Sequence, residues 1–190
     1  RLVKPGTRES DSKFELNVPA GIFISPQHAW AKILSNGAVQ VGLDDLVRKV
    51  FDKVDRVELP RPTQKVNKGD TLFSIGYGDY SLAIPAPLSG KVIAVNAEHA
   101  EHPEWLAIKP FELSWMCRIE PSDLAAELPG LKIGRDSVDW YQQEIDRFHE
   151  LASGFISGDD KDEEQQLSAT QYVELLDSFA KTFRQVEDPA

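Results

Sequence analysis

Short runs of alternating hydrophobic and polar residues fill most of the first 120 positions. Gly, Pro and an Asn-Gly pair separate these runs. This alternation predicts half-buried β-strands that reverse at tight turns, because successive side chains of a strand face opposite sides. We expect nine strands, at 14–18, 22–24, 30–34, 38–42, 54–59, 72–75, 80–84, 91–96 and 115–120.

The hydrophobic period changes to that of a helix in the segment 43–53. Leu46, Val47, Val50 and Phe51 form one apolar stripe there, and either of two aspartates, at 44 or 45, is placed to cap its start. Helical spacing returns at 137–152 and again from residue 168. The pattern therefore indicates a mainly β body with added helices, an α+β fold.

The C-terminal third divides into a spacer and two helices. Residues 129–152 are expected to form a helical extension that docks on the body. Residues 153–167 are rich in acidic residues, Gly and Ser, and predict a linker. Ser168 and Gln171 have the spacing of a capping box and open a last helix within 168–190. The apolar face of this last helix docks either on the body or on another protein, and the sequence favours neither.

The central stretch from Val66 to Asn96 contains a hairpin between two characteristic turns. The first turn reads Val-Asn-Lys-Gly-Asp from Val66, and the second reads Ala-Pro-Leu-Ser-Gly from Ala86. Between them, residues 76–79 read as a glycine-rich reversal. This arrangement resembles biotinyl and lipoyl carrier domains, which present a cofactor-bearing lysine at the tip of such a hairpin.

A wider set of motifs resembles the glycine cleavage system H protein family. The motifs run in the family's order across roughly residues 14–128. They are His28-Ala29-Trp30, Val41-Gly42-Leu43-Asp44-Asp45, Val57-Glu58-Leu59-Pro60, the second turn with Val95-Asn96, His102-Pro103-Glu104, Pro110-Phe111, and Trp115-Met116 with Arg118-Ile119 and Pro121-Ser122. The resemblance implies a lipoyl-type barrel-sandwich hybrid. Residues 1–13 are polar and contain Pro5-Gly6, so they are expected to form a mobile or extended entry.

The hairpin departs from the family at the position that carries the lipoyl group. Counting back from Ser89-Gly90, the resemblance places the family's lipoyl-lysine at Asp79, and no lysine occurs between Lys68 and Lys91. An aspartate has no amine that could form an amide with lipoic acid. We therefore expect no cofactor at this site.

Charge and composition narrow the class of partner. Residues 120–190 hold six Lys and Arg against seventeen Asp and Glu, whereas the rest of the chain is nearly neutral. This imbalance disfavours nucleic acid and suits a basic protein. No apolar run reaches the length of a membrane span. The single cysteine, Cys117, lies in a strand-like run and is expected to be buried. A cytoplasmic location is expected, and the chain begins without Met, which leaves room for a preceding segment.

No residues form a catalytic or metal-binding pattern. His28 is expected to pack inside the body, and His99 and His102 lack a third ligand in register. Tyr77 and Tyr80 are open to two interpretations, cross-strand packing or an exposed contact patch. The candidate protein-contact residues are Tyr77, Gly78, Asp79 and Tyr80 at the hairpin, and Tyr172, Leu176, Phe179 and Phe183 in the last helix.

We expect a non-lipoylated relative of H proteins that is not an enzyme and acts as a protein-binding or structural subunit of a larger complex. Its partner would contact the hairpin tip and the C-terminal helix. The alternative is a divergent acyl or aminomethyl carrier of glycine-cleavage type, modified at another lysine, for which Lys68 and Lys91 are the candidates.

Overall fold

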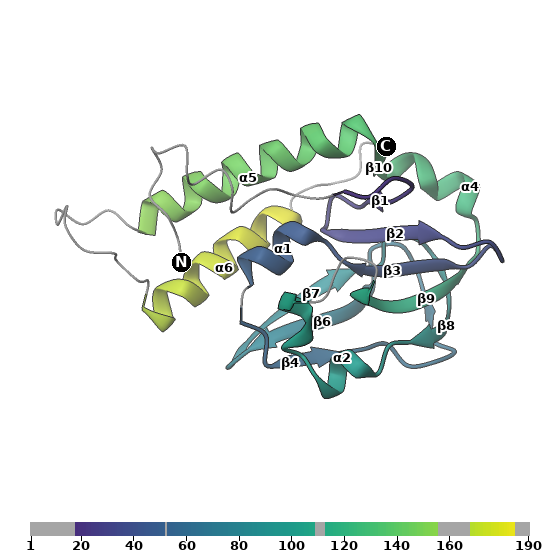
Figure 1. Cartoon of the computed structure of the whole chain (residues 1–190), viewed down its shortest axis with the longest axis horizontal. Helices are drawn as coiled ribbons and strands as arrows, with labels where there is room; N and C mark the ends of the chain where they lie inside the picture. The colour runs from purple at the N-terminus through teal and green to yellow at the C-terminus, as the bar shows by residue number, and fades with distance from the viewer. Residues whose placement is uncertain (1–17, 52, 109–112, 156–167, 185–190) are drawn as a thin grey trace.

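Antiparallel strands form the body of the chain, and two long helices lie along one side of it (Figure 1). The computed structural model describes residues 18–51, 53–108, 113–155 and 168–184. The strands are β1 (Phe23–Ile24), β2 (Ala29–Ile33), β3 (Val39–Leu43), β4 (Arg56–Glu58), β5 (Lys65–Val66), β6 (Thr71–Tyr77), β7 (Tyr80–Pro85), β8 (Gly90–Val95), β9 (Trp115–Pro121) and β10 (Lys132–Ile133). The α+β class expected from the sequence is confirmed.

The strands pair into two sheets. The larger sheet has the order β10-β1-β2-β3-β9-β8-β5, and the smaller has the order β4-β6-β7. The β2–β3 hairpin turns at Asn36-Gly37, where Gly37 has a φ of 83° and the Asn36 side chain accepts a hydrogen bond from the Ala38 amide at 3.1 Å. The expected Asn-Gly turn is therefore present. Glycine suits this position because it adopts a positive φ without strain.

Paired residues of β3 and β9 contribute side chains to the hydrophobic core. Val39 lies opposite Ile119, and Val41 lies opposite Cys117. All four side chains are fully buried. Burial raises the pKa of the Cys117 thiol to about 12, so this cysteine is a packing residue, as the sequence indicates.

Short helices connect the strands, and two long helices follow them. They are α1 (Asp45–Val50), α2 (Glu98–Glu101), α3 (Trp105–Ile108), α4 (Leu124–Glu127), a 3-10 turn at Leu128–Gly130, α5 (Arg135–Phe155) and α6 (Ala169–Arg184). The Asp44 side chain caps α1 by accepting a hydrogen bond from the Val47 amide at 2.9 Å. This settles the two capping candidates in favour of Asp44.

Helix α5 is longer than the sequence predicts. It continues through Phe155, so the first three residues of the predicted 153–167 linker are helical. Within this extension the Ser153 hydroxyl donates to the His149 carbonyl at 2.8 Å, a bond that a helix interior tolerates. Residues 156–167 of that linker, and the predicted mobile entry at 1–13, lie outside the described residues.

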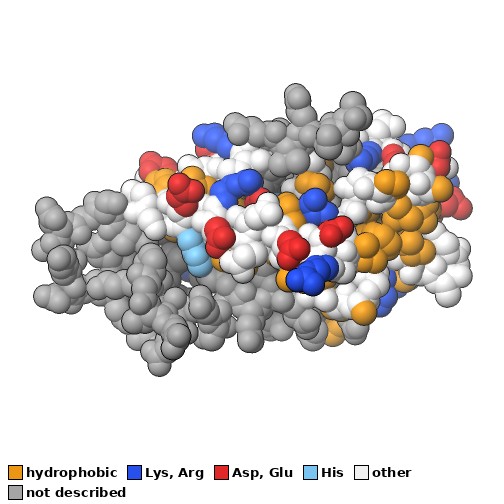
Figure 2. Space-filling view, turned by 90° about the horizontal axis from the view of Figure 1, so that it is seen from above, with side chains coloured by type: hydrophobic (Ala, Val, Ile, Leu, Met, Phe, Trp, Pro, Cys, Tyr) orange, Lys and Arg blue, Asp and Glu red, His pale blue; other side chains and the backbone are white. Residues whose placement is uncertain are grey.

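Helix α5 is amphipathic, and its outer face is charged. Tyr141, Ile145 and Phe148 are buried on the inner side, whereas Asp139 and Asp146 are exposed. Figure 2 looks down on the molecule from the side of α5 and shows acidic and basic side chains intermixed there. The inner face carries the apolar contacts, as the spacing of hydrophobic residues predicts. The inner face of α5 is therefore packed against the rest of the molecule.

We predict that Gly42→Ala destabilises the chain. A Cβ at position 42 would lie 2.5 Å from the Trp30 ring, which is almost fully buried. Overpacking of this kind costs about 1–3 kcal/mol, measurable as a lower urea midpoint. The matched control is Gly154→Ala, since a Cβ there meets nothing within 4 Å. A Gly42→Ala chain as stable as the control variant would contradict this packing.

Candidate functional site

The hairpin tip consists of Gly78 and Asp79 between β6 and β7. Tyr77 and Tyr80 are the last paired residues, so the turn has two residues instead of the four predicted at 76–79. Gly78 has a φ of 57°, a conformation that suits the first position of a two-residue hairpin turn. Asp79 is exposed. The apex therefore presents a carboxylate to solvent.

The first residue of β4 and the residue before it brace this tip. The Asp55 carboxylate accepts a hydrogen bond from the Gly78 amide at 2.8 Å, and the Arg56 guanidinium donates to the Gly78 carbonyl at 3.2 Å. Gly76 makes room for this arrangement, because a Cβ there would lie 2.5 Å from the Arg56 side chain. Both sides of the Gly78 backbone are thus held by neighbouring side chains.

The two tyrosines beside the tip are half-buried and pack within the molecule. The Tyr80 ring stacks on Phe51 with centroids 5.9 Å apart. The Tyr77 ring meets Tyr172 of α6 edge to face at 6.0 Å. Of the two interpretations that the sequence leaves open, packing is visible in the structure, and the exposed part of each ring remains available on the surface.

The candidate contact residues of α6 behave differently from those of the hairpin. Leu176 and Phe179, two of the candidate protein-contact residues, have no exposed surface. They are buried because α6 docks on the body, and the Phe179 ring lies 5.2 Å from that of Phe148. Tyr172 is half-buried, and its hydroxyl donates to the Val50 carbonyl at 3.1 Å. The side chain of Phe183 lies outside the described residues.

A lysine that the sequence does not single out lies beside the tip. The Lys53 ammonium is 6.0 Å from the centroid of the Tyr77 ring, and Lys53 is exposed. Lys68 precedes the start of β6, and Lys91 follows the end of β7, so both lie at the base of the hairpin. Lys53 and Tyr77 are 24 positions apart in the sequence, and the pairing of β4 with β6 brings them together.

His28 joins three parts of the chain at a fully buried position. Its Nδ1 lies 2.6 Å from Asp44 Oδ2, and its Nε2 lies 3.6 Å from Glu144 Oε2 on α5. His28 has a φ of 67°, which a non-glycine residue rarely adopts. The predicted packing of His28 inside the body is confirmed, and its partner Glu144 was not foreseen.

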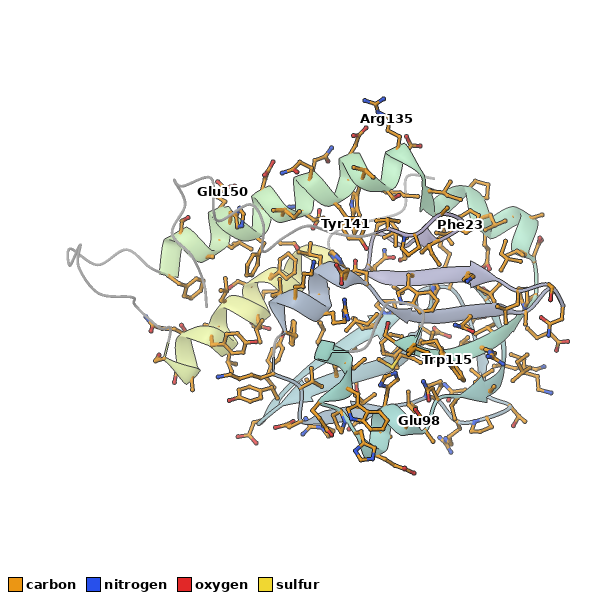
Figure 3. The ribbon with its side chains drawn as sticks, viewed as in Figure 1. Phe23, Glu98, Trp115, Arg135, Tyr141 and Glu150 are labelled. Carbon is orange, nitrogen blue, oxygen red and sulfur yellow. The ribbon has the colours of Figure 1, made fainter. Side chains whose placement is uncertain are left out.

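The two carboxylates keep this histidine charged. Burial is the largest single influence and lowers its pKa, but Asp44 and Glu144 together outweigh burial and raise the pKa from 6.5 to about 9. Tyr141 faces the same cluster: burial, followed by the Asp44 charge, raises its pKa well above the ordinary value. Figure 3 shows Tyr141 on the side of α5 that faces the sheets, while Arg135 points away.

His99 and His102 have different environments. His99 is buried, with Nε2 3.1 Å from the Leu113 carbonyl, whereas the exposed His102 stacks on Trp105 at 4.2 Å. Across the residues that the structure describes, no group of three His, Cys, Asp or Glu is placed to hold a metal ion. None of the described helices is long and apolar enough to cross a membrane.

Comparison with known proteins identifies the family. Residues 23–143 match the family described as "Glycine cleavage H-protein". The chain belongs to this family. The barrel-sandwich fold expected for H-protein relatives agrees with the two sheets seen here, and the family match ends inside α5, before Glu144 and all of α6.

Individual relatives support the assignment. A probable glycine cleavage system H protein of Thermococcus gammatolerans is 38% identical over 117 residues, which are 62% of this chain and 87% of that protein. A glycine cleavage system H protein of Staphylococcus epidermidis is 36% identical over 106 residues, 56% of this chain and 83% of that protein. The crystal structure of an H protein from Mycobacterium marinum is similar in fold, with a TM-score of 0.59 and 19% identity, covering 66% of this chain and 99% of that one.

We predict that the stability of the chain falls as pH rises from 6.5 to 9. The folded state binds the His28 proton more tightly than the unfolded state, so its contribution is complete below pH 6.5 and is lost as pH passes through 9. Linkage gives a loss of about 3 kcal/mol in the free energy of unfolding, measurable by urea titration at fixed ionic strength.

Two variants isolate the contribution of His28. His28→Asn removes the titrating ring and keeps a residue that tolerates positive φ, so its stability should vary less with pH over this range. His102→Gln changes an exposed histidine and should keep the wild-type slope. If His28→Asn shows the same slope as wild type, the buried proton is not the source of the pH dependence.

Proposed function

We propose that this chain is a non-lipoylated member of the H-protein family that serves as a protein-binding or structural subunit of a larger complex. The observation that supports this most directly is the exposed carboxylate of Asp79 at the apex of the hairpin. A lipoyl group is carried as an amide, which requires an amine on the protein. The residues at this apex, Gly78 and Asp79, do not fit such a group.

The shape of the tip also suits a fixed contact surface. Hydrogen bonds from Arg56 and to Asp55 hold Gly78 on both sides, and Tyr77 packs on α6. A rigid surface loses little conformational freedom when a partner binds it, which favours affinity. Tyrosines are common in such surfaces because they offer a large contact area with few rotatable bonds. The contact we propose comprises Tyr77, Gly78, Asp79, Tyr80 and the exposed part of Tyr172.

The charge of the chain indicates the character of the partner. Residues 120–190 carry seventeen acidic against six basic side chains, whereas at the tip the carboxylates of Asp55 and Asp79 are balanced by Arg56 and Lys53. A basic surface on the partner would be complementary to this field, and its association would weaken with added salt.

We predict that the wild-type chain gains no lipoyl group when it is co-expressed with a lipoate ligase and supplied with lipoate. Asp79→Lys places an amine at the apex of the same two-residue turn and should gain a lipoyl-sized increment. Intact-mass spectrometry of both proteins from matched cultures gives the answer. Because Asp79 is exposed at the turn, the substitution is not expected to disturb packing.

A positional control strengthens this test. Asp136→Lys changes charge equally at the exposed start of α5, far from the hairpin in sequence, and should remain unmodified. Modification of Asp79→Lys alone would identify the apex as the family's attachment position. A lipoyl-sized increment on the wild-type chain would contradict the proposed function.

The alternative function, a carrier modified at a non-standard lysine, now has a more specific candidate. Lys68 and Lys91 lie at the base of the hairpin, about 20 Å from the apex along a strand of seven residues. Lys53 lies beside Tyr77 and is the better-placed amine. Peptide mapping of the protein from its native cells tests this function: an acyl group on Lys53 that is lost in Lys53→Gln would favour it over the binding role.

A further inference from the structure

The two described sheets end in four edge strands, and β7 differs from the other three. Strands β10 and β5 have two residues each and contain Lys132 and Lys65. Strand β4 has three residues, and Arg56 and Glu58 are charged. Short length and charge are common means by which proteins keep an edge from pairing with another chain. Strand β7 has six residues, no charged side chain, and a proline only at its last position, Pro85.

Among the described helices and strands, only β6 runs alongside β7. The Leu82 and Ile84 side chains of β7 have almost no exposed surface and belong to the core. On the opposite face, Ser81 is exposed and Ala83 is half-buried. Neither of these two side chains is long enough to fold over the free side of the strand. The described part of the chain therefore leaves the edge of β7 open.

The register of the β6–β7 hairpin directs the backbone groups of Ser81 and Ala83 toward this open side. Tyr77 and Tyr80 close the two-residue turn as a hydrogen-bonded pair, and bonded and non-bonded pairs alternate along an antiparallel ladder. Ser81 and Ala83 thus belong to the non-bonded pairs. No turn or loop among the described residues supplies a backbone partner for them. Their N–H and C=O groups point away from β6 and recur about 7 Å apart.

We propose that the edge of β7 binds an extended segment of a partner protein, which adds a fourth strand to the smaller sheet. This deepens the proposed function and rests on it, because it states how the binding subunit holds its partner. Donors and acceptors that recur at this spacing match the main chain of another strand. A helix does not match them, because its backbone groups bond to one another. The backbone groups of β7 therefore select an occupant by its conformation.

The β7 edge is continuous with the contact surface that we propose at the hairpin tip. Tyr80 is the first residue of β7, and Asp79 directly precedes it. A segment paired with Ser81 and Ala83 would therefore reach the tip at one of its ends. The half-buried Tyr80 ring, stacked on Phe51, offers apolar area to a neighbouring strand. We thus expect apolar residues at alternate positions of the segment, on the side that faces this ring.

The charge of the chain disfavours a second copy as the occupant. One chain has a formal net charge of −10 at pH 7, so two copies repel each other. An extended segment of another protein does not meet this general repulsion unless it is itself strongly acidic. The occupant we assign is therefore a partner's segment, and a second copy is one of the outcomes that the test distinguishes.

Amide hydrogen exchange, measured by NMR on the full-length chain, tests whether the edge is open. The amides of Ser81 and Ala83 should exchange at least a hundredfold faster than those of Leu82 and Ile84, which face β6. Equally slow exchange of all four amides would overturn the proposal. If that protection disappears on dilution, a second copy is the occupant, and if it persists, another part of this chain covers the edge.

Binding is tested with a phage-displayed library of random twelve-residue peptides, selected on the full-length wild-type chain. Ser81→Pro removes an outward amide without breaking a bond to β6, and the matched control Ser81→Ala keeps that amide. The selected peptides should bind Ser81→Ala as they bind wild type, and Ser81→Pro at least tenfold more weakly. They should carry apolar residues at alternate positions and should slow the exchange of the Ser81 and Ala83 amides.

Two results of the selection would overturn the proposal. One is equal binding of the selected peptides to the two Ser81 variants, and the other is a selection that enriches no peptide. If circular dichroism shows that Ser81→Pro is unfolded, Ala83→Pro replaces it, with Ala83→Ser as its control. If both proline variants are unfolded, the wild-type chain decides, because a bound peptide must then slow exchange of the Ser81 and Ala83 amides at least tenfold.

The outcome is separable from that of the proposed function. A wild-type chain that gains a lipoyl group but binds extended peptides at β7 retains the edge site and loses the non-lipoylated role. A bare chain whose selected peptides do not distinguish the Ser81 variants retains the role and loses this site.

Discussion

The ion-paired His28 is the interaction on which the arrangement of this chain depends. It lies inside the protein between Asp44, which also caps α1, and Glu144 of α5. Taking three ionisable groups out of water is costly, and the loss of any one would leave its partners buried without compensation. The contact therefore specifies where α5 lies relative to the sheets. The position of α6 follows, because Phe179 of that helix packs against both the His28 ring and Phe148.

The buried cluster of His28, Asp44 and Glu144 positions the C-terminal helices, and these helices reach the central hairpin. Once α5 and α6 are docked, Tyr172 reaches Tyr77, and the hairpin tip acquires a helical neighbour. Arg56 and Asp55 hold the other side of the tip. In place of an amine that could carry a cofactor on a long arm, the apex offers a short braced turn ending in Asp79. Under the proposed function, these surroundings of the apex recognise a partner instead of delivering a bound group.

Local features of the sequence predicted much of this structure. The Asn36-Gly37 turn, the central hairpin and the burial of His28 follow from periodicity, turn chemistry and the family resemblance. The capping box at Ser168 forms as expected, with hydrogen bonds in both directions.

The sequence could not predict contacts between distant residues, because neither the pairing of Glu144 with His28 nor the approach of Lys53 to Tyr77 leaves a local pattern. The apolar stripe of α6 predicted burial, but a stripe does not identify the surface that covers it. The start of the linker was placed too early because Ser153 and Gly154 have the composition of a loop, while the helix hydrogen bonding continues through them.

The most direct test of the central claim is the intact mass of the chain purified from the cells that normally make it. Our account predicts the mass of the bare polypeptide, because the apex carries a carboxylate and the function lies in the surface around it. An added mass equal to a lipoyl group, on Lys53 or on any other lysine, would contradict that account.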